Sequence, residues 1–306
     1  MEVFLSLLLE ITPLYIFIIV GFVAGKYANL SKESVSLLSI YFLVPCVMFY
    51  GVMQAEFSAQ IVVLPLIVFA ISTFACFILY NIGKRFLDNK TQANILALAA
   101  GTSNSGYYGI PVAIILFEPH IVGVYVTAVL GKVIFQNSVG FYMTALGNYS
   151  AKESLKKLLT LPPLYAFILA VILQFYELKI PEFLDGFFVS VKGAYTFIGM
   201  MIIGVGISQI ARLSLDVKFT SVALFGRMIL WPLLAFAVYM IDQSTFGLIG
   251  EGGKKALLLA SLVPLAADTV AIASILKCHP EEMGTAVLIS SVIALIYVPL
   301  MISLFI

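Results

Sequence analysis

The sequence has little charge. Asp, Glu, Lys and Arg make up 11% of its 306 residues, against about a quarter in ordinary soluble domains, and hydrophobic residues make up 62%. The apolar residues occur in blocks of about 20, the length that crosses ~30 Å of hydrocarbon. The composition therefore excludes a soluble globular domain and predicts a polytopic membrane protein.

The residues that several kinds of chemistry require are also scarce. The three cysteines show no metal-binding spacing, and the two histidines lie in predicted loops. The chain has no His-Glu-x-x-His helix, no Walker A sequence and no pair of deep carboxylates. These absences argue against intramembrane proteases and ATP-driven pumps. The sequence indicates no enzyme, no nucleic-acid partner and no bound organic cofactor.

The hydropathy predicts an all-α protein with ten transmembrane segments joined by short loops. The segments lie at roughly 5–26, 34–53, 61–83, 92–116, 121–147, 162–177, 186–208, 219–241, 254–276 and 282–305. Eleven of the 17 Lys and Arg residues fall in loops on one side of the membrane and three on the other. Since cytoplasmic loops carry the excess positive charge, both termini are expected on the non-cytoplasmic side of the inner, or plasma, membrane.

The two halves of the chain resemble each other. The matching pairs are Pro13–Ile18 with Pro163–Ile168, Thr127–Leu130 with Thr285–Leu288, and Pro111 with Pro264. All three fall in register across a division into five and five segments. Because five is odd, the second half must enter the membrane from the opposite side. A single membrane domain is therefore predicted, with inverted repeats at 1–150 and 151–306.

The fourth and ninth segments carry a proline and polar residues in their middles. The fourth reads Gly-Thr-Ser-Asn-Ser-Gly-Tyr-Tyr-Gly-Ile-Pro over 101–111, and its glycines and Pro111 are expected to break the helix. The ninth has Pro264 followed by Asp268. Helix breaks survive in lipid only where they are packed in protein or line a cavity. Paired breaks predict a binding site near the bilayer midplane, and a plain proline kink is the alternative for the fourth segment.

Ionisable residues inside the segments define the candidate site. Asp268, the only deep carboxylate, could carry a coupling proton, ligate Na⁺ beside Thr269 and Asn104, or cap the half-helix that follows it. Lys132, with Gln136 one turn further on, could bind an anionic substrate or pair with Asp268.

Two further cations lie inside segments. Lys192 is near the outer end of the seventh segment, and Arg227 is in the inner part of the eighth. Long cationic side chains reach the membrane interface from such positions, so both are expected to be structural. Residues 151–157 are expected to form an amphipathic loop at the interface.

The stretch from Asn104 to Pro111 resembles the asparagine-to-proline stretch in the fourth segment of the auxin efflux carrier family. The sequences at 264–269, 279–281 and 297–300 are similar to later parts of that family. The resemblance implies two inverted five-helix repeats with broken, crossing fourth and ninth segments, as in bile acid:sodium symporters. It also implies that segments 1, 2, 6 and 7 form a scaffold and that the rest form a mobile transport domain.

The resemblance implies a secondary transporter that moves small organic anions by an elevator-like shift. Bacterial relatives commonly carry asparagine in the ninth segment, whereas this chain has Asp268. The expected substrates are carboxylates, either dicarboxylates or auxin-like acids. H⁺ or Na⁺ coupling, passive transport as a channel or uniporter, and a homodimer through the scaffold helices all stay open. The expected substrate-binding residues are Ser103, Asn104, Tyr107, Pro111, Lys132, Gln136, Pro264 and Thr269.

Overall fold

The described part of the chain is helical. The computed structural model describes residues 2–54, 59–87, 89–145, 162–209 and 214–305, and within them no β-strand occurs apart from one isolated bridge. The helices of the first half are α1 (Glu2–Tyr27), α2 (Lys32–Leu38), η1 (Ser39–Leu43), α3 (Val44–Gln54), α4 (Ala59–Phe86), α5 (Lys90–Gly101), η2 (Ser105–Gly109), α6 (Ile110–Leu116), α7 (Pro119–Phe135), η3 (Gln136–Gly140) and α8 (Phe141–Ala145).

The second half contains the remaining helices. These are α10 (Pro162–Phe175), η4 (Glu182–Leu184), α11 (Asp185–Ser208), α12 (Val217–Phe225), η5 (Gly226–Leu230), α13 (Trp231–Ser244), α14 (Gly250–Leu262), α15 (Asp268–Ile275) and α16 (Pro280–Phe305). Here η1, η2, η3 and η5 are π-helical turns, and η4 is a 3₁₀ turn. The predicted interfacial loop at 151–157 lies outside the described residues.

Seven helical stretches in the described residues are long and apolar enough to cross a membrane. They coincide with the predicted first, second, third, fifth, seventh, eighth and tenth segments. The fourth and ninth segments are interrupted, and the sixth is the 14-residue helix α10. The all-helical membrane architecture is confirmed, whereas the division into ten segments and two inverted repeats stays a prediction.

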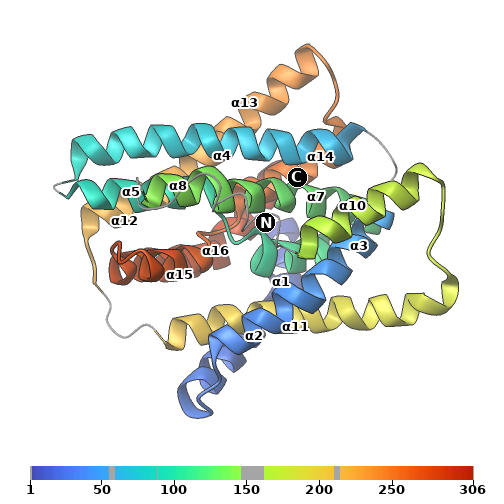
Figure 1. Cartoon of the computed structure of the whole chain (residues 1–306), viewed down its shortest axis with the longest axis horizontal. Coiled ribbons are helices and arrows are strands. Elements are labelled where there is room, and N and C mark those ends of the chain that lie inside the picture. Colours follow the sequence, from blue (N-terminus) through green and yellow to red (C-terminus); the bar gives the residue numbers. More distant parts are fainter. Residues whose placement is uncertain (1, 55–58, 88, 146–161, 210–213, 306) are drawn as a thin grey trace.

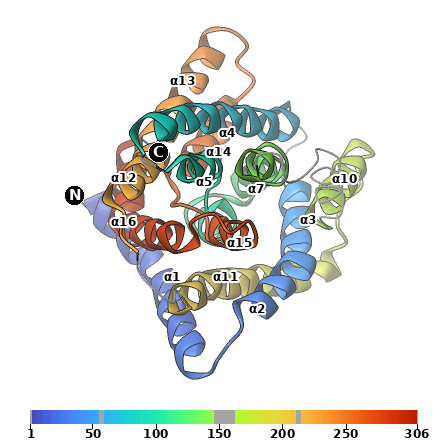
Figure 2. The same ribbon diagram turned by 60° about the vertical axis from the view of Figure 1, so that its left-hand side comes forward.

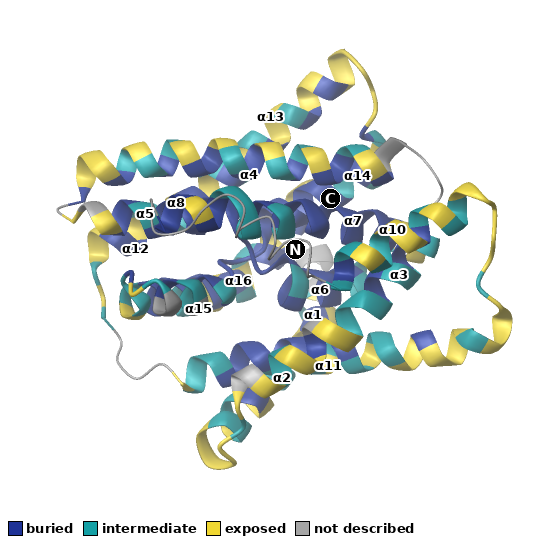
Figure 3. Ribbon diagram, in the orientation of Figure 1, coloured by how far each residue is buried: buried dark blue, intermediate teal, exposed yellow. Residues whose placement is uncertain are grey.

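The helices pack as two groups with the interrupted segments near the centre (Figures 1 and 2). In the first group, α11 packs against α1, α2 and α3, and α10 packs against α3. In the second group, α4 packs against α5, α7 and α12, α14 packs against α7 and α13, and α15 packs against α16. Exposed faces lie on the outer helices such as α4, α11 and α13, while α5 and α7 are largely buried (Figure 3). Large apolar side chains on the outer helices are exposed, as lipid contact requires.

Glycines bring α1 and α11 into close contact. A Cβ atom on Gly204 would overlap the Ile18 carbonyl, and one on Gly21 would overlap the Met201 carbonyl. Small residues at helix interfaces let backbones approach closely, which is a main source of attraction between helices in lipid. The two helices therefore form a tightly packed pair.

We expect Gly204→Ala to destabilise the protein by about 1–3 kcal/mol, because the added methyl group must push α1 away from α11. Gly193→Ala is the matched control, since Gly193 lies on the same helix and a Cβ atom there meets nothing within 4 Å. Thermal unfolding in detergent measures both. Equal melting temperatures for the two variants would contradict the assigned role of this contact.

A hydrogen-bonded joint connects α5 to α12. Asp216 accepts the Phe219 N–H at 3.0 Å at the start of α12, and the Gln92 side-chain amide at the start of α5 donates to it at 2.9 Å. The bond from the Phe219 N–H is the main reason that the pKa of Asp216 lies below its usual value. This joint holds the beginning of the interrupted fourth segment against the eighth.

Candidate functional site

The two interrupted segments meet at their breaks. The first break separates α5 from η2, and the second separates α14 from α15. Ser103 and Leu265 form an antiparallel bridge, and the Asn104 N–H donates to the Pro264 carbonyl at 2.8 Å. Backbone groups that each break frees therefore satisfy groups at the other break, which is what an apolar interior requires. The fourth segment is broken, so a plain kink at its proline is excluded.

Side chains from neighbouring helices satisfy further backbone groups at the breaks. The Tyr125 hydroxyl on α7 donates to the Ser105 carbonyl at 3.1 Å. At the second break, the Leu265 N–H donates to the Ser290 hydroxyl of α16 at 3.2 Å. The geometry of the crossing thus depends on α7 and α16 as well as on the two broken segments.

The glycines of the fourth segment provide space. A Cβ atom on Gly101 would overlap the Phe135 ring, and one on Gly109 would overlap the Tyr125 hydroxyl. Neither glycine has the positive φ angle that would require glycine for conformational reasons. At these two positions glycine permits close packing. The break itself follows Gly101 directly, between α5 and η2.

Arg227 has a structural role, as expected, but its side chain packs inside the protein instead of extending outward. Its side chain is completely buried, its Nε donates to the Val263 carbonyl at 2.7 Å, and its Nη2 donates to the Ala260 carbonyl. The guanidinium carbon also lies 5.1 Å from the centre of the Trp231 ring. These carbonyls belong to the C-terminal end of α14, where the helix dipole favours a cation. Arg227 therefore caps the half-helix that ends at the second break.

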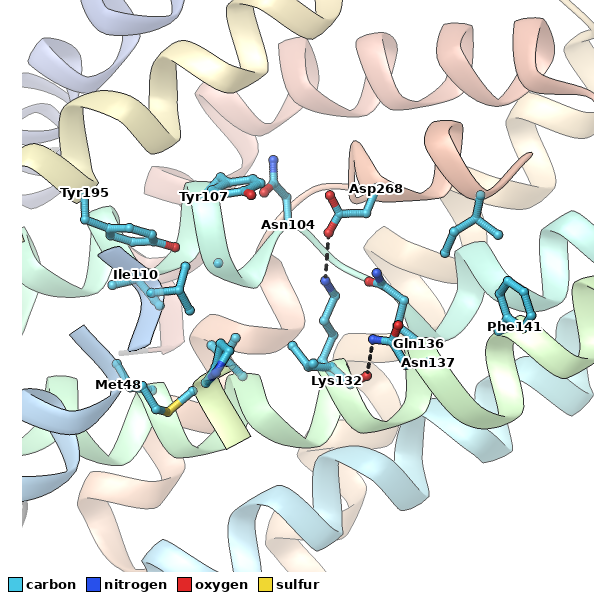
Figure 4. Close-up of a pocket in the computed structure, with 17 residues that line it drawn as sticks. Met48, Asn104, Tyr107, Ile110, Lys132, Gln136, Asn137, Phe141, Tyr195 and Asp268 are labelled. Atoms are coloured by element: carbon cyan, nitrogen blue, oxygen red, sulfur yellow. Dashed lines mark hydrogen bonds and ion pairs between the residues drawn. The ribbon is translucent and has the colours of Figure 1, made fainter. Parts of the chain in front are cut away.

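A cavity of about 340 Å³ lies beside the crossing (Figure 4). Its volume falls within the ~300–1,000 Å³ of small-molecule pockets. Most of its lining is apolar, and the larger apolar side chains include Met48, Ile110, Val126, Val129, Phe141 and Ile272. Of the predicted site residues, the structure brings Asn104, Tyr107, Lys132, Gln136 and Asp268 together in its wall.

An ion pair crosses the wall of this cavity. Lys132 Nζ on α7 lies 3.5 Å from Asp268 Oδ2, at the first residue of α15 (Figure 4). The Lys132 side chain is 7% exposed and that of Asp268 is 37% exposed, so the carboxylate is the more accessible partner. Of the alternatives for Lys132, pairing with Asp268 is the contact present in this structure. The Asp268 carboxylate also stands at the favourable N-terminal end of a helix.

Three buried polar atoms of the cavity have no hydrogen-bond partner among the described residues. They are Asn104 Nδ2, Gln136 Oε1 and the Tyr195 hydroxyl. Buried polar groups are normally paired, so unpaired ones that line a cavity indicate where a ligand or water binds. Asn104, Gln136 and Tyr195 line the same cavity as Lys132.

Tyr195 lines the cavity but was not predicted from the sequence as a site residue. It lies on α11 of the first helix group, and its ring centre is 6.5 Å from that of Tyr107 in η2. Its position in the seventh segment carries no pattern that distinguishes it from a packing tyrosine. The depth of Arg227, one turn before Trp231, was a signal for an internal role that the sequence did contain.

The other predicted residues lie at the breaks but do not line the cavity. The Thr269 hydroxyl donates to the Ala266 carbonyl at 2.6 Å, and the Ser103 hydroxyl pairs with that of Ser105. Pro111 is in the first turn of α6, which continues directly from η2. Pro264 supplies the carbonyl for the crossing. These four residues shape the breaks in the structure.

Comparison with known proteins identifies the family. A family model described as membrane transport protein matches residues 6–153 and 148–302. The chain belongs to this family, the auxin efflux carrier family. The resemblance noted in the sequence is thereby confirmed, and the chain is a multi-pass membrane protein of a transporter family.

Two archaeal relatives are similar to the chain. An uncharacterised transporter of Methanocaldococcus jannaschii is 26% identical over 296 residues, which cover 93% of this chain and 94% of the relative. An uncharacterised transporter of Methanothermobacter thermautotrophicus is 24% identical over 168 residues, which cover 53% of this chain and 56% of the relative.

Proposed function

We propose that this family member is a secondary transporter of small carboxylates and that the cavity at the crossing is its substrate site. The observation that carries the proposal is that two broken helices meet beside a cavity whose wall includes the Lys132 ammonium. Broken helices in transporters place polar backbone ends and ion-binding groups at mid-membrane depth. Asn104, Tyr195 and Lys132 would hold the substrate carboxylate.

The position of the cavity supports alternating access. Val44, Met48 and Tyr195 contribute to its wall from the first helix group, while Asn104 and Lys132 contribute from the interrupted fourth segment and the second group. A shift of one group past the other, as in an elevator mechanism, would therefore carry the substrate across. We place both termini on the non-cytoplasmic side of the cell membrane, following the positive charges of the loops.

The lining supports a substrate with one carboxylate and an apolar body. Among the described residues that line the cavity, Lys132 is the only Lys or Arg, and most of the wall is aliphatic or aromatic. A second carboxylate would lose its hydration against apolar side chains and gain no cation. Within the expected range of substrates, an aromatic or aliphatic monocarboxylate therefore fits better than a dicarboxylate.

We expect phenylacetate to bind the purified protein at least ~10-fold more tightly than malonate, because an unpaired buried charge costs more than the ~1.4 kcal/mol that a tenfold difference represents. Calorimetry in detergent and uptake of radiolabelled compounds into proteoliposomes measure this preference. Tighter binding of malonate would contradict the assigned substrate class, and binding of neither would contradict the proposed site. Single-channel current steps in planar bilayers would instead show a channel.

A further inference from the structure

The cation of the cavity already has a protein partner. Lys132 Nζ lies 3.5 Å from Asp268 Oδ2, and the pair lines the cavity proposed to bind the substrate. A substrate carboxylate that approaches this ammonium must compete with the carboxylate of Asp268. Two carboxylates beside one ammonium repel each other, and the repulsion is strong where little water screens it. The resting pair is neutral, whereas the complex would carry one uncompensated negative charge.

We propose that a substrate carboxylate displaces Asp268 from Lys132 and that Asp268 then takes up one proton, so that each monocarboxylate crosses the membrane together with one proton. This inference rests on the proposed function of the cavity. The proton comes from water on the side where the substrate enters and bonds to an Asp268 carboxylate oxygen. On the other side the substrate leaves, the proton returns to water, and Lys132 pairs with Asp268 again. The cavity is neutral in both states, so charge balances at each step.

The titratable groups near Asp268 are already protonated near neutral pH or engaged elsewhere, so Asp268 is the group that accepts the proton. Tyr107 from η2 and Tyr195 from α11 line the same cavity, and phenols are already protonated near neutral pH. Arg227 from η5 keeps its charge as a guanidinium bonded to α14. Helices α5 and α16 also pack against α15. The titratable residue of α5 is Lys90, in its first turn. Those of α16 are Glu281 and Glu282 in its first turn and Tyr297, whose hydroxyl donates to the Met228 carbonyl.

The hydrogen bonds at the second break favour a proton over Na⁺. Sodium sites at broken helices use unwound backbone carbonyls as ligands. Here the Val263 carbonyl accepts from Arg227, and that of Pro264 accepts from the Asn104 N–H. The Ala266 carbonyl accepts both the N–H and the hydroxyl of Thr269, the side chain expected to ligate Na⁺. At this break three carbonyls and the Thr269 hydroxyl are therefore already engaged within the protein, whereas a proton needs only one carboxylate oxygen.

The first test uses the wild-type protein in detergent with phenylacetate as the probe. Calorimetry in two buffers with different heats of ionisation counts the protons bound, and we expect about one per phenylacetate at pH 7.5. The association constant should also fall about tenfold for each unit rise in pH between 7 and 8.5, because one proton is linked to binding. A pH-independent association constant with no proton uptake would overturn the proposal.

The second test identifies the acceptor. Lys132→Arg keeps a permanent charge at this position, so proton uptake should persist at about one per phenylacetate and cannot occur on residue 132. The double variant K132R/D268N should bind phenylacetate with no proton uptake. Loss of proton uptake in the single variant K132R would place the proton on Lys132 and overturn the assignment to Asp268. Thermal unfolding checks that both variants fold. If they do not, the pH dependence of phenylacetate binding to the wild type decides whether proton uptake accompanies substrate binding.

A sodium titration completes the design. At constant ionic strength, replacing choline with Na⁺ should leave phenylacetate affinity unchanged. An increase that D268N removes would show Na⁺ coupling and overturn the proton assignment. If the wild type binds neither phenylacetate nor malonate, the proposed substrate site itself fails. Binding without proton uptake overturns only the coupling, so the two failures are distinguishable.

Discussion

Asn104→Ala is expected to lower phenylacetate uptake into proteoliposomes by about 10- to 100-fold, with little change in the melting temperature. A hydrogen bond to a charged group contributes about 1.5–3 kcal/mol, which corresponds to this range. The Asn104 amide nitrogen has no hydrogen-bond partner among the described residues and lies in the cavity wall. Its removal therefore costs binding energy toward a carboxylate and breaks no hydrogen bond between that nitrogen and the described residues.

The backbone of residue 104 explains why the fold should survive this change. Its N–H donates to the Pro264 carbonyl, and its carbonyl accepts the N–H groups of Tyr108 and Gly109 at 3.2 and 3.0 Å. Alanine keeps all three bonds. Ser72→Ala is the matched control, because the buried Ser72 hydroxyl also lacks a partner among the described residues but lies outside the cavity lining. Full uptake by Asn104→Ala would contradict its role in binding.

Arg227→Met is expected to lower the melting temperature by roughly 10 °C and to abolish uptake. The change leaves the Val263 and Ala260 carbonyls without their donor in a buried site, and each unpaired group costs about 1–3 kcal/mol. For a protein of this size, 1 kcal/mol corresponds to a shift of about 2–4 °C. The second break would then lose the cap that positions α14 relative to Asp268.

Two further variants separate the geometry of Arg227 from its charge. Arg227→Lys keeps the charge but loses the planar fork that bonds two carbonyls at once, so we expect an intermediate melting temperature. Arg85→Met is the matched control, because Arg85 is exposed in the last turn of α4. A wild-type melting temperature and wild-type uptake in Arg227→Met would show that the cap is dispensable.

The contrast between Asn104 and Arg227 shows which site residues could be predicted from the sequence. Asn104 stands among glycines and serines next to Pro111, so its polar surroundings inside an apolar segment mark it. Arg227 has only apolar neighbours after it, and the length of its cationic side chain suggested that it extends to the interface. Its actual partners are carbonyls of α14, more than 30 residues away in the chain. No local pattern identifies a partner at that separation.

The same reason explains the residues that were placed incorrectly or missed. Thr269 is adjacent to Asp268, and adjacency suggested a shared ligand. In the structure the Thr269 hydroxyl closes its own turn by donating to Ala266. Tyr195 reaches the cavity from α11 because that helix packs against η2. Side-chain direction at a break depends on how the free backbone groups are satisfied, and that depends on the neighbouring helices.

By itself, the amino-acid sequence determined that the chain is helical and crosses the membrane, because each apolar block must satisfy its own backbone in lipid. It also located the two interrupted segments and the acidic and basic residues inside the apolar segments, Asp268 and Lys132. Tertiary structure decided that the breaks bond to each other, that Lys132 meets Asp268, and that Arg227 caps the second break. Hydropathy is a property of consecutive residues, whereas these contacts join residues that only helix packing brings together.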